Sequence, residues 1–198
     1  AIQHLYGTNN TFNLGNTSYF FDDSTTYFET IWDSGGTDEI VYSGKQPIEL
    51  SLDSASGSFI GKRVQGYSDN GAYLTEIKNI YIADFVTIEN ASGGSGNDLI
   101  EGNFASNFLV GGRGNDNLYG HGANDVFEGG EGNDFIYGGE GVDIVLRSLS
   151  DFEVNFLGEK SFQVRSSGYE GTDNLFSVER IYIGNLDSPA RIIGLDIK

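Results

Sequence analysis

The sequence predicts an all-β fold, a parallel β-roll flanked by short-strand segments of β-sandwich-like character. Six nine-residue units follow one another without a break from Gly93 to Leu146. The eighth position of every unit is apolar, which gives a regular inward-pointing side chain. Strand-like alternation elsewhere, with 38% hydrophobic and 13% aromatic residues, opposes disorder. Together these observations indicate short strands that become stable only when they stack.

Before the units, residues 1–92 contain short runs rich in aromatic and β-branched residues, separated by polar turns. Runs of this kind are typical of strands. They are YFFDD (19–23), YFETIWD (27–33), EIVYS (39–43), IELSL (48–52) and IKNIYIADFVTIENA (77–91). We therefore expect an N-terminal β segment ahead of the array.

Each nonapeptide is expected to divide into a six-residue loop and a three-residue strand. The units read GGSGNDLIE, GNFASNFLV, GGRGNDNLY, GHGANDVFE, GGEGNDFIY and GGEGVDIVL. Loop glycines allow backbone angles that other residues avoid, so carbonyl oxygens can converge on one point. The sixth position adds a carboxylate or amide, at Asp98, Asn107, Asp116, Asp125, Asp134 and Asp143. The eighth position points inward, at Ile100, Leu109, Leu118, Phe127, Ile136 and Val145.

The GGxGxDxUx period of these units is similar to the calcium-binding nonapeptide repeat of RTX proteins. Two units are then expected to form one turn of a flattened right-handed coil, so that residues eighteen positions apart stack. Stacked strands lie about 4.8 Å apart. Two carboxylates at that spacing repel by roughly 3 kcal/mol at an effective dielectric constant of about 20.

An oxygen-lined gap between stacked anions suits a hard cation of flexible coordination, and calcium fits better than magnesium or zinc. Zinc is further disfavoured because the chain has no Cys and only two histidines, His4 and His121. We expect His4 to pack at a domain edge and His121 to contribute only its carbonyl oxygen.

After the units, residues 147–198 are expected to cap the roll, because the last coil would otherwise expose a sheet end and an apolar ladder. DFEVNFLGEKSFQVR (151–165) predicts a hairpin that turns at Leu157 to Lys160. The tail from Ala190 to Lys198 is compatible with a C-terminal type I secretion signal.

Composition limits the organisation and the partners of the chain. Its 198 residues suit one elongated domain or two small ones. We expect one, divided into residues 1–92, 93–146 and 147–198. A formal net charge of −18 argues against nucleic acid and anionic membrane surfaces as partners. No apolar run is long enough to insert in a membrane. Because the sequence contains no Met, Ala1 is not expected to be a translational start.

Three segments resemble one RTX family more closely, the C-terminal domain of serralysins. They are AIQHLYG (1–7), WDSGGTDE (32–39) and VTIENASGGSGND (86–98). Serralysins are secreted zinc metalloproteases of Gram-negative bacteria, so the resemblance implies an extracellular protein. Their catalytic HExxH signature is absent here, which implies a chain without a catalytic centre. EGTDNLFSVERIYIG (170–184) instead resembles the closing segment of RTX adhesins and large secreted enzymes, so the parent protein stays open.

The resemblance also implies several calcium sites, roughly four to seven. Upstream, it implies Asn13, Gly15 and Thr17 facing Asp33, Gly35 and Asp38, and a second site with Asp38, Gly36, Thr87 and Glu89. Trp32 is expected in the core beside the first of these. In the array, the second, fourth and sixth loop positions face the first, third and sixth positions of the loop eighteen residues later. The sets are Gly94, Gly96 and Asp98 with Gly111, Arg113 and Asp116; Gly112, Gly114 and Asp116 with Gly129, Glu131 and Asp134; Asn103, Ala105 and Asn107 with Gly120, Gly122 and Asp125; and His121, Ala123 and Asp125 with Gly138, Glu140 and Asp143. The Asn107 site is expected to be the weaker, because its amide oxygen is neutral.

These expectations favour a module that folds on meeting extracellular calcium and supports type I secretion of a larger protein. Its partners would be calcium, the secretion machinery in passing, and a catalytic domain of the parent. The main rival is a polysaccharide- or surface-binding module that uses Tyr119, Phe135 and Tyr137 as aromatic faces. A catalytic carboxylate pair is the weakest alternative, because no placed nucleophile or open metal site accompanies it.

Overall fold

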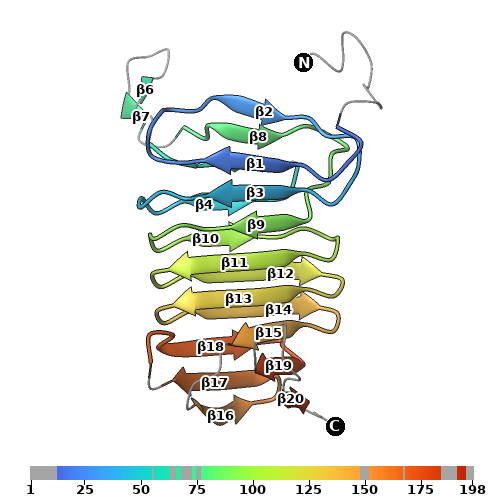
Figure 1. Cartoon of the computed structure of the whole chain (residues 1–198), viewed down its shortest axis with the longest axis vertical. Coiled ribbons are helices and arrows are strands. Elements are labelled where there is room, and N and C mark those ends of the chain that lie inside the picture. Colours follow the sequence, from blue (N-terminus) through green and yellow to red (C-terminus); the bar gives the residue numbers. More distant parts are fainter. Residues whose placement is uncertain are drawn as a thin grey trace.

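The computed structural model describes residues 13–54, 56–62, 66–67, 73–74, 77–147, 152–166, 168–183 and 191–194. Every regular element in these ranges is a β-strand, which confirms the all-β class. The strands stack along the long axis of the molecule (Figure 1). In the described part of the chain, no helix has the length and apolar character needed to cross a membrane.

Most described strands belong to two sheets that lie one behind the other in the view of Figure 1. The larger contains, in spatial order, β1 (Ser18–Phe21), β3 (Glu39–Tyr42), β9 (Asn90–Ser92), β11 (Phe108–Arg113), β13 (Val126–Glu131), β15 (Ile144–Arg147), β19 (Arg180–Ile183) and β20 (Arg191–Gly194). The other contains β16 (Phe152–Gly158), β17 (Ser161–Ser166), β18 (Thr172–Phe176), β14 (Phe135–Glu140), β12 (Asn117–Gly122), β10 (Leu99–Glu101) and β4 (Glu49–Ser51). The chain alternates between the sheets through the array, which confirms the parallel roll.

Upstream strands continue both sheets of the roll. Parallel pairs join β1 to β3 and β3 to β9 in the first sheet, and β4 to β10 in the second. Two smaller sheets lie toward the N-terminal end, β2 (Glu29–Ile31) with β8 (Ile80–Ile82) and β5 (Gly57–Ser58), and β6 (Gly66–Tyr67) with β7 (Tyr73–Leu74). Trp32, beside β2, is partly buried and packs against the core.

The predicted stacking of residues eighteen apart is confirmed by the strand register. Phe108 pairs with Val126 in one sheet and Asn117 with Phe135 in the other. The expected strand length of three residues is wrong for β11 to β14, which have six residues each. These strands extend into the next unit because its first residues also pair with the neighbouring coil, as Gly112 does with Gly130. Only the fourth to sixth positions therefore form the tight turn.

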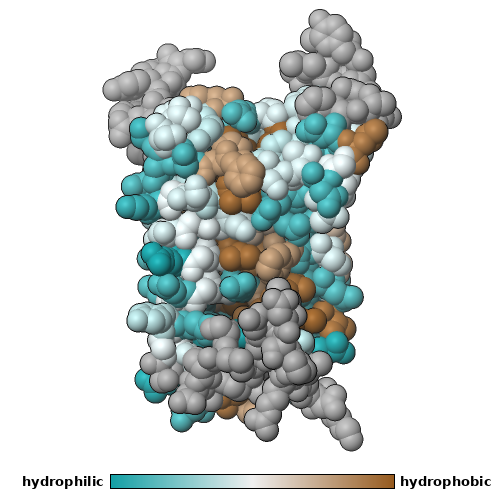
Figure 2. Space-filling view, in the orientation of Figure 1, coloured by the Kyte–Doolittle hydropathy of each residue, from teal (hydrophilic) through white to brown (hydrophobic). Residues whose placement is uncertain are grey.

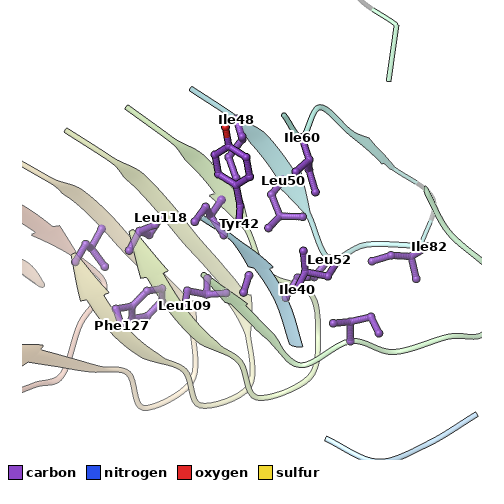
Figure 3. Close-up of a cluster of buried hydrophobic side chains, with 14 of the residues drawn as sticks. Ile40, Tyr42, Ile48, Leu50, Leu52, Ile60, Ile82, Leu109, Leu118 and Phe127 are labelled. Carbon is purple, nitrogen blue, oxygen red and sulfur yellow. The ribbon is translucent and has the colours of Figure 1, made fainter. Parts of the chain in front are cut away.

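The inward side chains form one continuous apolar ladder. All six predicted eighth-position residues have 0% exposure. The ladder extends upstream through Leu50, which pairs with Ile100, and downstream through Leu175 and Ile181, which pair with Ile136 and Val145. Figure 3 shows its upstream part, where Ile40, Tyr42 and Leu50 lie near Leu109 and Leu118. Each array strand from β10 to β14 buries one apolar side chain, and stacking makes these into a core.

The C-terminal strands extend both sheets past the end of the array. β18 and β19 pair parallel with the last strands of the array, and β17, β16 and β20 then add antiparallel strands. The hairpin between β16 and β17 turns at residues 159–160, as predicted. Residues 148–151 lie outside the described ranges, as does most of the proposed secretion signal at 190–198.

Candidate metal centre

The sixth-position side chains form two stacks, one along each edge of the roll. We call the edge with loops 93–98, 111–116 and 129–134 the odd edge, and the edge with loops 102–107, 120–125 and 138–143 the even edge. The N–H of Asp98 donates to Oδ1 of Asp116 at 2.7 Å, and the N–H of Asp116 donates to Oδ1 of Asp134 at 2.9 Å. On the even edge, Asn107 donates to Asp125 and Asp125 to Asp143, at 2.8 and 2.9 Å. One oxygen of each stacked aspartate is thus used to hold the preceding coil.

Sequence reasoning missed the last member of each stack. The N–H of Asp134 donates to Oδ1 of Asp173 at 3.1 Å, and the N–H of Asp143 to Oε2 of Glu179 at 2.9 Å. A signal was present, because GYEGTDNLF (168–176) places Gly171, Asp173 and Leu175 at the fourth, sixth and eighth positions of a unit. The spacing hid it, since Asn174 pairs with Phe135 across an inserted hairpin and not eighteen residues away.

Five described aspartates, one upstream of the array and four within it, bury their second carboxylate oxygen without a hydrogen-bond partner. This holds for Oδ2 of Asp38, Asp116, Asp125, Asp134 and Asp143. A buried carboxylate oxygen without a donor is destabilising, so such a group requires a cation or a proton. The first two loops differ. Oδ2 of Asp98 accepts from the N–H of Gly94 at 2.9 Å, and Oδ1 of Asn107 from the N–H of Asn103 at 2.8 Å.

Main-chain carbonyl oxygens converge beside these unpartnered carboxylate oxygens. A Cβ built on Gly111 would lie 2.4 Å from Oδ2 of Asp116 and 2.5 Å from the carbonyl oxygen of Gly129. On the even edge, a Cβ on Gly120 would lie 2.2 Å from Oδ2 of Asp125 and 2.5 Å from the carbonyl oxygen of Gly138. Each pair joins a carboxylate of one coil to a carbonyl of the next, which is the oxygen-rich environment that calcium prefers.

Carbonyls at the second and fourth loop positions also face the next coil. A Cβ on Gly114 would lie 1.9 Å from the carbonyl oxygen of Gly96, and one on Gly130 would lie 1.9 Å from that of Gly112. These positions have φ between 104° and 135° at Gly112, Gly114, Gly130 and Gly132. In the fourth unit the same turn is made by His121 and Ala123, at φ of 74° and 68°. The backbone geometry is therefore kept where glycine is absent, at a cost of about 1 kcal/mol or more per residue.

The structure brings the predicted upstream residues together in part. The carbonyl oxygens of Asn13 and Thr17 accept from the N–H groups of Ser34 and Glu39, at 3.3 and 2.9 Å. A Cβ on Gly36 would lie 2.7 Å from the carbonyl oxygen of Gly15, so the two loops lie face to face. The N–H of Asp38 donates to Oε2 of Glu89 at 2.8 Å, which supports their predicted neighbourhood. Thr87, also predicted for this group, is exposed.

Side chains alone do not build a metal site in the described residues. No group of three or more His, Asp or Glu side chains is arranged to hold a metal ion there. Any ion between the coils would therefore take most of its ligands from main-chain carbonyls. His121 lies at a left-handed turn position, and His4 lies outside the described residues.

Burial changes the protonation of the stacked aspartates. Desolvation raises the pKa of Asp116 and of Asp125 to about 7. Neighbouring carboxylates raise it further, while the N–H donors to Oδ1 oppose the shift. A cation between the coils would lower the pKa of these aspartates again, because an opposite charge favours the ionised form.

In calcium-free buffer we therefore expect the folded state to gain stability in acid. The unfolded carboxyl has a pKa of about 3.9, so the folded state holds protons that the unfolded chain has released. This stabilisation is complete below about pH 4 and is lost as pH rises through the folded pKa of about 7. Circular dichroism in EGTA should show more strand at pH 5 than at pH 8. A double variant with Asp116→Asn and Asp125→Asn should weaken this pH dependence without abolishing it, because burial also raises the pKa of Asp134, Asp143 and Asp173. Strand content that increases with pH would contradict the assignment.

Comparison with known proteins agrees with this geometry. The RTX calcium-binding nonapeptide repeat matches residues 92–127 and 119–146. The chain is 41% identical over 121 residues to a serralysin of Proteus mirabilis and 41% identical over 122 residues to the metallopeptidase AprA of Pseudomonas marginalis. These matches cover 55% of the chain and 22% and 23% of the two relatives, so the chain spans about a quarter or less of their length. Serralysin B of Dickeya chrysanthemi is 41% identical over 115 residues, which are 50% of this chain and 21% of that protein. Residues 92–146 of this chain therefore match the RTX calcium-binding nonapeptide repeat, and the chain is similar to serralysins over 55% of its length.

Proposed function

We propose that this chain is a calcium-triggered folding module, which supports export and stability of a secreted bacterial protein. The observation that carries the proposal is the row of buried, unpartnered Oδ2 atoms beside converging carbonyl oxygens. The two best-supported sites lie between the loops ending at Asp116 and Asp134, and between those ending at Asp125 and Asp143. The loops ending at Asp98 and Asn107 satisfy their own side-chain oxygens, so their sites would be weaker.

Energetics support calcium as the deciding contribution. Extracellular calcium modules have dissociation constants of about 10⁻⁴ to 10⁻³ M. At ten times that concentration each site adds about 1.4 kcal/mol, and about five sites add about 7 kcal/mol. A whole domain is stable by only about 5–15 kcal/mol. Where calcium is scarce, the contribution vanishes and the repulsion among the 29 acidic residues remains.

This difference suits a protein that leaves the cell through a narrow channel. An expanded chain inside would pass the type I secretion machinery, and folding outside would oppose its return. The parent would be a secreted Gram-negative protein, with a catalytic domain elsewhere. The relatives named serralysin and metallopeptidase favour a protease as that parent.

A calcium titration of the purified chain tests this function. In EGTA at neutral pH we expect weak strand signal and a radius of gyration near the unfolded value of about 48 Å. Calcium should restore the strand signal cooperatively between about 10⁻⁴ and 10⁻³ M and more than halve the radius. Magnesium at the same concentrations should not restore the strand signal, because it requires a smaller site with near-ideal octahedral geometry. Strand content that EGTA leaves unchanged would sink the proposal.

A second candidate function is binding of polysaccharide to the outer face of the seven-stranded sheet. The rings of Tyr119, Phe135 and Phe176 follow one another there, with centroids 5.8 and 4.9 Å apart, and Tyr137 is 42% exposed. A row of aromatic rings offers stacking surfaces, although these rings also pack on one another. A glycan array with calcium present separates this function from the first.

A further inference from the structure

The closing coil of the roll contains a buried guanidinium group. Arg147, the last residue of β15, is 5% exposed. Its Nη1 donates to Oδ2 of Asp173 and to the carbonyl oxygen of Glu170, and its Nε lies 3.5 Å from Oε2 of Glu170 without forming a hydrogen bond. Its Nη2 is buried without a hydrogen-bond partner. A buried arginine is destabilising unless it is paired, so this side chain has a defined place in the fold.

The loop that contains Glu170 and Asp173 resembles the loops of the repeats. Asp173 takes the sixth position on the odd edge, because Oδ1 accepts the N–H of Asp134 as in every earlier coil. Gly171 takes the fourth position, with φ of 63° and a Cβ site 2.1 Å from the carbonyl oxygen of Gly132. Leu175 takes the eighth position, buried against Ile136. The closing loop 168–173 and the two residues after it therefore match the repeat at its fourth, sixth and eighth positions. The loop differs in one contact, because the N–H of Gly132 donates to the carbonyl oxygen of Tyr169, at the second position, whereas the N–H of Gly114 donates to that of Glu131, at the third.

The closing loop differs from the interior loops in the partner of its second carboxylate oxygen. Oδ2 of Asp116, Asp125, Asp134 and Asp143 has no partner, whereas Oδ2 of Asp173 accepts from a guanidinium. The even edge ends in a similar way, since Oε1 of Glu179 pairs with Nζ of Lys160 at 3.1 Å. None of the ion pairs in the described part of the chain involves the four interior aspartates.

We propose that the guanidinium of Arg147 occupies the cation place of the closing coil, so that the odd edge takes no calcium between loops 129–134 and 168–173. The inference rests on the proposed calcium sites of the interior coils. A guanidinium supplies a positive charge and directed N–H donors to carboxylate and carbonyl oxygens. Because it is tethered to the chain, this cation is present at every calcium concentration. The C-terminal end of the odd edge then closes without calcium.

The number of calcium ions bound per chain tests the inference. The matched variants are Asp173→Asn in the closing coil and Asp125→Asn in an interior coil, each measured by equilibrium dialysis and elemental analysis. Asp173→Asn should bind as many ions as the unmodified chain, and Asp125→Asn at least one fewer. Loss of an ion from both variants would overturn the place given to Arg147. Full calcium binding by Asp125→Asn would overturn the interior sites themselves, and the inference with them.

A second pair of variants covers the case in which Asp173→Asn does not fold. Arg147→Gln leaves a buried carboxylate unpaired, so the calcium midpoint of folding should rise by about two- to fivefold. Adding Asp173→Asn to Arg147→Gln removes that charge and should return the midpoint to within about twofold of the unmodified chain. A double variant as impaired as Arg147→Gln alone would show that Arg147 acts only by packing, against the inference.

Discussion

Gly132→Val is expected to prevent the last coils from stacking, even in saturating calcium. The new Cβ would lie 1.7 Å from the carbonyl oxygen of Gly114 and 2.7 Å from its carbon. Backbone atoms cannot yield without opening the coil, and φ of 135° at this position is strained for any β-branched residue. The expected loss exceeds about 4 kcal/mol, which places the variant among the most damaging class of substitutions.

Circular dichroism and urea unfolding with calcium present measure this effect. Gly158→Ala is the matched control, since nothing lies within 4 Å of its Cβ site. The control should stay within about 0.5 kcal/mol of the unmodified chain. Native strand content and an unchanged urea midpoint in Gly132→Val would show that the coils are spaced more widely than described.

Phe127→Ala should remove the largest of the six inward side chains of the array and destabilise the roll by about 3–5 kcal/mol. Phe127 has no exposed surface and lies between Leu109 and Val145 in consecutive coils of its sheet. The cavity would separate the coils that carry the even-edge carboxylates, so the calcium midpoint should rise as well. Phe104→Ala, at a ring that is 89% exposed, should change neither quantity measurably. Equal effects from the two alanine variants would contradict the buried ladder.

Sequence alone predicts the parts of this fold that follow the local period. The inward ladder from Ile100 to Val145, the eighteen-residue register and the stacked carboxylates all follow from a constant spacing of glycine, aspartate and apolar residues. The glycine, aspartate and apolar positions of one repeat indicate its loop and strand, and the succession of repeats indicates how the strands stack. The ladder, the register and the carboxylate stacks can therefore be predicted from the sequence.

The remaining features depend on contacts that the period does not encode. Asp98 and Asn107 belong to loops with the repeat spacing, yet Oδ2 of Asp98 and Oδ1 of Asn107 accept from N–H groups of their own loops. Asp173 reaches the odd edge only because the intervening residues form the β16–β17 hairpin. Arg147 resembles any surface arginine in the sequence, and its burial follows from the closing coil alone.

The alternation of the chain between two sheets has a consequence for how such arrays change length in evolution. Consecutive nonapeptides belong to opposite sheets, so loss or gain of one would transfer every later strand to the other sheet. The closing strands β18 and β19 would then meet unsuitable partners, since each pairs with a particular strand of the array. Duplications or deletions of whole turns leave both ends matched, which makes the pair of repeats the natural unit of inheritance.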